Sequence, residues 1–229
     1  MKNQYISKVL KPLSLCAVVM LFGCKQDQKK EDVAMSDNIL LQEWTGPYQG
    51  VPAFDKMSVA DVKPAMETAM ELSLAEIDNI ANNPEAPTFE NTIVEMERSG
   101  KVLDRVFTYY GIMSSNVSSP EFREVQTELA PKISEYSSKI SQNEKLFQRI
   151  KTVYDASQEN PLEPDQQRVV DLTYKRFEMN GANLDSTKKE RYAAINKELS
   201  TLYTKFANNF LRHAIHYLQT LCIVLKVLC

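Results

Sequence analysis

Apolar residues recur every three or four positions along most of the chain, and this spacing predicts amphipathic helices. The first predicted helix follows Ser58 and stops at the Asn-Asn-Pro sequence of residues 82–84. Pro64 falls near its start, where we expect a short first turn followed by a new helix. The residues that share its apolar face are Met66, Ala69, Met70, Ile77 and Ile80.

A second helix is predicted to begin after Thr88, whose side chain can cap it. Pro87 disfavours a helical conformation in the residue before it, so the helix should not start earlier than Thr88. Gly100 lies on the apolar face of this helix, which predicts the close approach of a neighbouring helix. The apolar positions of this long stripe are Phe89, Ile93, Met96, Leu103, Phe107 and Tyr110.

A third helix should open at Ser119-Pro120-Glu121, which offers a cap, a proline at the first position and an acid in the first turn. Pro131 lies inside this helix and should kink it. Its expected core face consists of Phe122, Val125, Leu129, Ile133, Tyr136 and Ile140.

Three more helices follow, over residues 144–154, from Pro164 to Gly181, and from about Ser186 onwards. Residues 40–57 do not follow the helical pattern. We predict an extended segment there, interrupted by glycines and prolines. No stretch alternates with the period of a strand, so we predict an all-α fold of antiparallel helices joined by short turns. Such stripes usually face a core, and the inward residues expected here are Val169, Leu172, Phe177, Tyr192, Ile195, Leu199, Leu202 and Phe206.

The N-terminus resembles a bacterial lipoprotein signal. A basic start is followed by an apolar run over residues 13–22 that is too short to span a bilayer, and the run ends in Leu-Phe-Gly-Cys. We expect residues 1–23 to be the signal peptide, Cys24 to carry the lipid, and residues 24–39 to be a flexible tether. The protein would then lie in the cell envelope, on the periplasmic or outer-membrane face. An ordinary cleaved signal is the alternative.

Charge and cysteine content argue against two classes, nucleic-acid-binding proteins and disulfide-dependent folds. The formal net charge is −3, and residues 1–23 hold three Lys and no acid, so the remainder is more acidic still. This balance argues against nucleic acid as a partner, because nucleic-acid binding needs a basic stripe. No cysteine occurs between Cys24 and Cys222, so the fold does not depend on disulfides.

No catalytic or metal-binding residue can be chosen from the sequence. The two histidines are His213 and His216, and no HExxH motif occurs. A zinc site that activates water needs about three protein ligands and a general base. The two histidines with Cys222 and Cys229 match no standard zinc spacing, and no triad or phosphate loop is present.

A series of short motifs resembles the N-terminal part of the thimet-oligopeptidase family of zinc metallopeptidases. They occur in order as Val51–Asp55, Pro64–Met66, Asn82–Pro84, Pro87–Thr92, Leu129–Lys132, Tyr174–Phe177, Gly181–Leu184, Asn196–Ser200 and Phe206–Asn209. The resemblance implies a helical wall of a deep channel that admits short peptides, and the dipeptidyl branch removes C-terminal dipeptides. The zinc ligands, the catalytic Glu and the oxyanion-stabilising His and Tyr of that family lie beyond the matched region, so no residue here takes those roles. Glu90, Asn91 and Asn183 are better explained by capping and turns.

The resemblance ends near Leu211. Residues 40–210 form the family-like domain, whereas residues 211–229 are apolar and contain both histidines. A frameshift or premature stop would explain this tail; a membrane-docking tail and a small metal site are the alternatives. Two functional hypotheses follow. The chain is a fragment of a peptidyl-dipeptidase or oligopeptidase and inactive alone, or it is a stand-alone helical envelope lipoprotein that binds peptides or a partner without catalysis.

Overall fold

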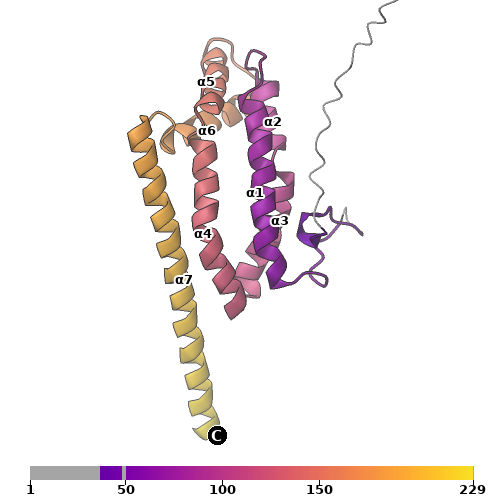
Figure 1. Cartoon of the computed structure of the whole chain (residues 1–229), viewed down its shortest axis with the longest axis vertical. Helices are drawn as coiled ribbons and strands as arrows, with labels where there is room; N and C mark the ends of the chain where they lie inside the picture. Colours follow the sequence, from indigo (N-terminus) through magenta and orange to yellow (C-terminus); the bar gives the residue numbers. More distant parts are fainter. Residues whose placement is uncertain (1–36, 48–49, 229) are drawn as a thin grey trace, which may run out of the picture. The chain divides into compact units, whose positions relative to one another are not determined.

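The structure is a computed structural model that describes residues 37–47 and 50–228, so Cys24, the signal peptide and Cys229 lie outside the described residues. The all-α prediction is confirmed, since these ranges contain no strand beyond an isolated bridge between Thr45 and Val51. None of their helices is both long and apolar enough to cross a bilayer. The α-helices, labelled in Figure 1, are α1 (Val59–Ala81), α2 (Glu95–Arg98), α3 (Lys101–Asn116), α4 (Pro120–Ser141), α5 (Glu144–Glu159), α6 (Pro164–Met179) and α7 (Ser186–Leu228).

Two shorter helices complete the order of elements, a 3-10 turn η1 (Ile39–Leu41) and a π-helix η2 (Phe89–Val94). The predicted N-terminal caps are present. The Thr88 side chain accepts from the backbone N of Asn91 at 3.1 Å, and Ser119 accepts from that of Phe122 at 3.1 Å. Polar residues therefore satisfy backbone donors that a helix start leaves without partners.

The prolines do not interrupt their helices. Pro64 lies within α1, which is continuous from Val59, rather than between a first turn and a new helix. A proline there removes one backbone donor. The complete burial of Val62, Ala65 and Met66 on either side offsets this loss. Pro131 likewise lies inside α4, which is assigned as one helix.

The predicted second helix is broken at Gly100. This residue has φ of 78°, a left-handed conformation that glycine adopts at low cost, and it separates α2 from α3. Its N–H donates to Glu76 Oε2 at 2.6 Å. A Cβ at this position would meet Ser73 Oγ at 3.6 Å, an ordinary contact. Gly100 therefore serves the backbone turn and not the close helix approach that the apolar pattern suggested.

This break divides the apolar residues between two hydrophobic cores. The first core joins η1, α1, α3 and α4 around Leu41, Met66, Val106, Phe122 and Leu129. The second core joins the end of α1 with η2, α5 and α6, and its buried members include Ile80, Ile93, Phe147, Ile150, Val170 and Phe177.

Two other expectations need correction. Helix α5 extends to Glu159, beyond the predicted end at Tyr154. In α6, Leu172 is exposed and Val170 is buried in its place, because Val170, Thr173 and Phe177 form the face that meets α5 and η2.

The segment before α1 is folded onto the first core. Leu40 and Leu41 are fully buried, and the backbone N of Ala53 donates to the hydroxyl of Tyr109 at 2.7 Å. Gly50 has φ of 100°, and a Cβ there would lie 2.4 Å from the backbone oxygen of Trp44. The extended stretch predicted over residues 40–57 thus contains a 3-10 turn and a tight glycine turn.

Candidate functional site

Helix α7 presents the most unusual surface of the described residues. It runs beside α4 (Figure 1), and its start is held by an ion pair of 3.0 Å between Lys189 and Glu144 at the start of α5. The apolar stripe predicted to face inward is exposed in the structure. We call this surface the α7 stripe, and its exposed members are Ile195, Leu199, Leu202, Tyr203, Phe206, Phe210, Leu211 and Tyr217.

The stripe is exposed because α7 turns a smaller and more polar face towards α4. Ala193, Ser200 and Thr204 are among the half-buried residues of α7. The Asn208 side chain donates at 3.4 Å both to the backbone oxygen of Arg123 and to Thr127 Oγ1. Since no described element lies on the opposite side, the apolar residues of α7 remain without a cover.

A groove of about 740 Å³ separates the N-terminal part of α4 from the later part of α7. Its charged lining residues are Arg123, Glu124, Glu128, Lys205 and Arg212. Because both basic and acidic residues line the groove, it favours neither anionic nor cationic ligands. Beyond Arg212, α7 continues as a helix to Leu228.

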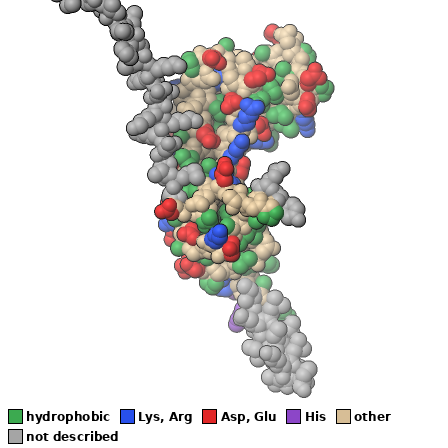
Figure 2. Space-filling model, turned by 90° about the vertical axis from the view of Figure 1, so that its right-hand side faces the viewer, with side chains coloured by type: hydrophobic (Ala, Val, Ile, Leu, Met, Phe, Trp, Pro, Cys, Tyr) green, Lys and Arg blue, Asp and Glu red, His purple; other side chains and the backbone are tan. Residues whose placement is uncertain are grey.

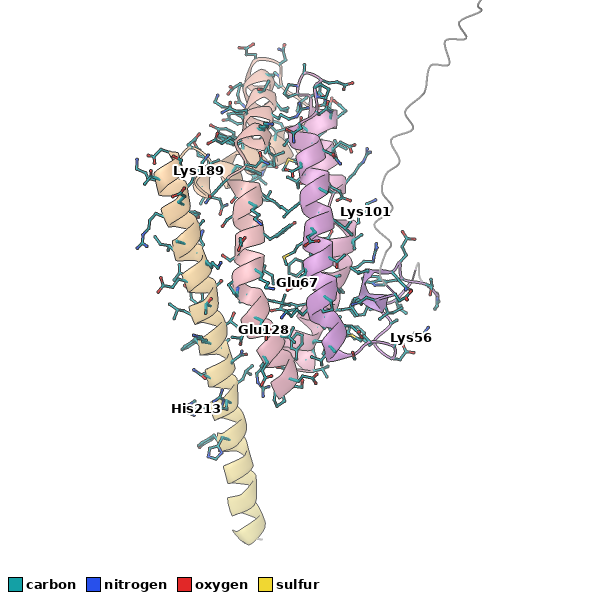
Figure 3. The ribbon with its side chains drawn as sticks, viewed as in Figure 1. Lys56, Glu67, Lys101, Glu128, Lys189 and His213 are labelled. Carbon is teal, nitrogen blue, oxygen red and sulfur yellow. The ribbon has the colours of Figure 1, made fainter. Side chains whose placement is uncertain are left out.

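Ion pairs connect α1 to α4. Lys63 pairs with Glu128 and Lys132 pairs with Glu67, and Figure 3 labels the two acids. The hydrogen bond from Lys63 lowers the pKa of Glu128 and raises that of Lys63. In Figure 2, basic and acidic side chains are mixed over the visible face without a field of one sign. These charges act as structural links between helices.

Asn91 has a structural role. Its Oδ1 accepts from the backbone N of Thr88 at 2.9 Å and from Arg149 Nη2 at 2.8 Å. Arg149 is only 6% exposed, and its Nη1 donates at 2.9 Å to the backbone oxygens of both Asn83 and Glu85. Burial lowers the pKa of Arg149, against a smaller opposing effect of Glu85. Arg149 therefore fixes the loop between α1 and η2.

The other polar residues singled out from the sequence are placed on the surface. Asn183 donates to Glu178 Oε1 at 3.2 Å, which supports a turn role, and Glu90 lies exposed in the first turn of η2. His213, labelled in Figure 3, and His216 are exposed on α7. In the described part of the chain, no group of three or more His, Cys, Asp or Glu is placed to hold a metal ion.

Comparison with known proteins identifies the family. The model of the N-terminal domain of neurolysin and thimet oligopeptidase matches residues 65–189, more than half of the chain. Dipeptidyl carboxypeptidase of Salmonella typhimurium is 31% identical over 77% of this chain and 26% of its own length. The Escherichia coli dipeptidyl carboxypeptidase is 30% identical over 76% of this chain and 25% of its own length. Oligopeptidase A of Escherichia coli is 29% identical over 70% of this chain and 24% of its own length.

The chain belongs to the thimet oligopeptidase family of peptidases. More narrowly, the part that matches is the helical N-terminal domain, and the chain spans about a quarter of the length of the relatives named above. The match to the family model stops at residue 189, in the first turn of α7, so the exposed α7 stripe lies beyond the residues that this model matches.

Proposed function

We propose that this chain is the N-terminal, channel-wall part of a zinc-dependent peptidyl-dipeptidase or oligopeptidase and has no catalytic activity by itself. In the complete enzyme it would help to limit substrates to short peptides, from whose carboxyl ends dipeptides are removed. The family match over residues 65–189 supports this proposal, together with curated relatives that are about four times longer than the matched part.

The observation that carries the proposal is the α7 stripe. Within the family-like residues 40–210, six large apolar side chains of α7, from Ile195 to Phe210, are exposed to solvent. Contiguous apolar surface of this kind marks a contact with another protein surface. A catalytic part that follows the N-terminal domain in the longer relatives would cover this stripe, whereas an isolated domain has no use for it.

The described residues do not fit a peptidase zinc site. Such a site needs three protein ligands and a base, and neither an HExxH sequence nor a suitable cluster is present. We therefore assign no step of peptide hydrolysis to any residue of this chain. The metal and the chemistry would come from a catalytic part.

Two measurements test the proposal. The purified chain, supplied with zinc, should not cleave a blocked tripeptide that the Salmonella dipeptidyl carboxypeptidase cleaves in the same assay. Reading the coding DNA beyond codon 229 in all three frames should reveal an HExxH sequence. Chelator-sensitive cleavage by the chain alone contradicts its inactivity, and a downstream region without the motif favours a stand-alone binding protein.

We further propose that Cys24 is lipidated and holds the protein in the cell envelope. The support is the order of a basic start, an apolar run and Gly23-Cys24 in the sequence. Wild-type protein should enter the membrane fraction, and Cys24→Ser should move it to the soluble fraction. Cys16→Ser, within the apolar run, is the matched control and should leave the distribution unchanged. Soluble wild-type protein without a lipid overturns this assignment.

A further inference from the structure

The α7 stripe contains a regular repeat of apolar residues. Ile195, Leu199, Leu202 and Phe206 follow one another at steps of four, three and four residues. This is the heptad spacing of a helix that packs lengthwise against another helix. All four side chains are exposed, so no described element is that second helix. The next position of the repeat is the polar Asn209, which limits the apolar repeat to the four residues before it.

The repeat lies on the side of α7 that faces away from α4. Asn208 contacts α4, because its side chain donates to the backbone oxygen of Arg123. Phe206 and Phe210 stand two residues before and after Asn208, and an α-helix of 3.6 residues per turn places such neighbours on nearly opposite sides. In Figure 1, α7 forms the outer edge of the domain. Another helix can therefore lie along the repeat without displacing α4.

Two opposite charges lie along one edge of the repeat. Glu198 and Lys205 are both exposed and are seven residues apart, so they occupy equivalent positions in the heptad. When two identical helices pair antiparallel, this edge meets the same edge of the other copy, and each glutamate then faces a lysine. A parallel pair would instead bring both charges to the other edge, where Tyr203 and Phe210 lie. Charge complementarity thus favours the antiparallel arrangement.

We propose that a second copy of this chain covers the repeat in an antiparallel dimer whose twofold axis passes between residues 200 and 201. Ile195 packs against Phe206 of the partner subunit, and Leu199 packs against Leu202 of the partner subunit. Glu198 forms an ion pair with Lys205 of the partner subunit. The twofold axis repeats each of these contacts, so one surface supplies both halves of the interface.

The contact is small, which sets the expected strength of the dimer. The repeat covers about three helical turns on each copy. A stable interface buries about 800 Å² per partner, more than one short helix face provides. We therefore expect a reversible dimer with a dissociation constant on the order of 10 μM. The inference goes beyond the proposed function, since it concerns the chain by itself; a catalytic part would compete for the same surface.

The test is sedimentation equilibrium of the purified full chain at concentrations on both sides of the expected dissociation constant. Glu198→Lys and Lys205→Glu should each weaken the dimer by about fivefold or more, because two attractive pairs become two repulsive ones. The variant with both changes should return to the affinity of the wild type, since the reversed charges again complement each other. Glu190→Lys is the control: it makes the same charge change at an exposed α7 residue before the repeat and should dimerise like the wild type.

Three results would overturn the proposal. A wild-type chain that stays monomeric leaves the repeat without a second copy. Single charge reversals that have no effect, or a double reversal that does not recover, contradict the antiparallel register. Association that continues beyond a dimer and ignores both reversals is nonspecific aggregation and contradicts it as well. All three leave the proposed function intact, because that function is tested by the cleavage assay and by the downstream coding sequence.

Discussion

Helices α4 and α7 carry the same kind of apolar pattern, yet they use it in opposite ways. The α4 residues Phe122 and Leu129 are 0% exposed, because α1 and α3 cover that face. In α7, Phe206 is 71% exposed and Phe210 is 66% exposed. The two helices lie side by side and share an interface. The apolar face of α4, however, packs against α1 and α3 and not against α7.

The contrast distinguishes the apolar residues that stabilise the domain from those that are available to bind another molecule. Burial of apolar area stabilises the fold, and exposed apolar area costs solubility unless a partner covers it. The stability of the described part should therefore reside in the two cores, and the later half of α7 should contribute little. We propose that it serves as a contact with another protein surface.

The sharpest test of this contrast replaces one phenylalanine in each helix. Phe122→Ala should lower the free energy of unfolding by about 3 to 5 kcal/mol, because it leaves a cavity in the first core. Phe206→Ala should change it by less than about 0.5 kcal/mol, as is usual for a surface residue. Urea unfolding followed by circular dichroism measures both. Comparable losses in the two variants would mean that α7 also buries its stripe in solution.

A second test concerns a buried polar group in the second core region. Arg149→Met should cost about 3 kcal/mol, because three acceptors around the loop of residues 83–91 lose their donor. The control, Arg168→Met, removes an arginine that is exposed on α6 and should stay within about 0.5 kcal/mol of the wild type. Differential scanning calorimetry distinguishes them. An unchanged unfolding temperature for Arg149→Met would show that the loop holds without this arginine.

The third test acts on the stripe without touching a core. The double variant Phe206→Ser and Phe210→Ser should reduce self-association of the purified chain while the free energy of unfolding stays within about 1 kcal/mol of the wild type. Sedimentation velocity over a range of concentrations provides the measurement. Met179→Ser, at an isolated exposed methionine at the end of α6, is the control and should associate like the wild type. Unchanged association in the double variant would remove the stripe as an interaction surface.

Local signals predicted the fold well. The caps at Thr88 and Ser119, the stop at Asn82 and the apolar faces of α1 and α4 all depend on residues within one or two helical turns. The break at Gly100 could not be predicted in the same way, because the apolar pattern continues across it. A glycine inside a helical pattern can be tolerated within the helix or can end it. Only the contact of its N–H with Glu76 and the separation of the two cores fix its conformation.

The surfaces were harder to predict than the helices. Periodicity indicates that α7 has an apolar face, but it cannot tell which neighbour covers that face, and here none of the described elements does. Arg149 also carries no local signal, since its partners Asn83, Glu85 and Asn91 are distant in sequence. A hollow lined by Met96, Ile140, Phe177 and Tyr192 is built from α2, α4, α6 and α7, so its composition becomes visible only when the chain is folded.

The last and smallest expected effect concerns the polar contact between α4 and α7. Hydrogen bonds from Lys139 and Lys197 lower the pKa of Glu135, and Lys197 belongs to α7. A carboxyl group with a lowered folded-state pKa stabilises the fold at pH values above its ordinary pKa of 4.5, and this contribution disappears as the pH falls through the lowered value. Below that value the start of α7 should be held less firmly, by less than about 1 kcal/mol, since the pair is half-exposed.

Hydrogen exchange of the α7 amides at neutral and acidic pH would detect the change. Glu135→Gln should remove this part of the pH dependence, and Glu124→Gln, an exposed α4 acid without an ion pair, should preserve it. An unaltered pH dependence in Glu135→Gln would mean that the smaller side chains of the interface alone hold α7 against α4.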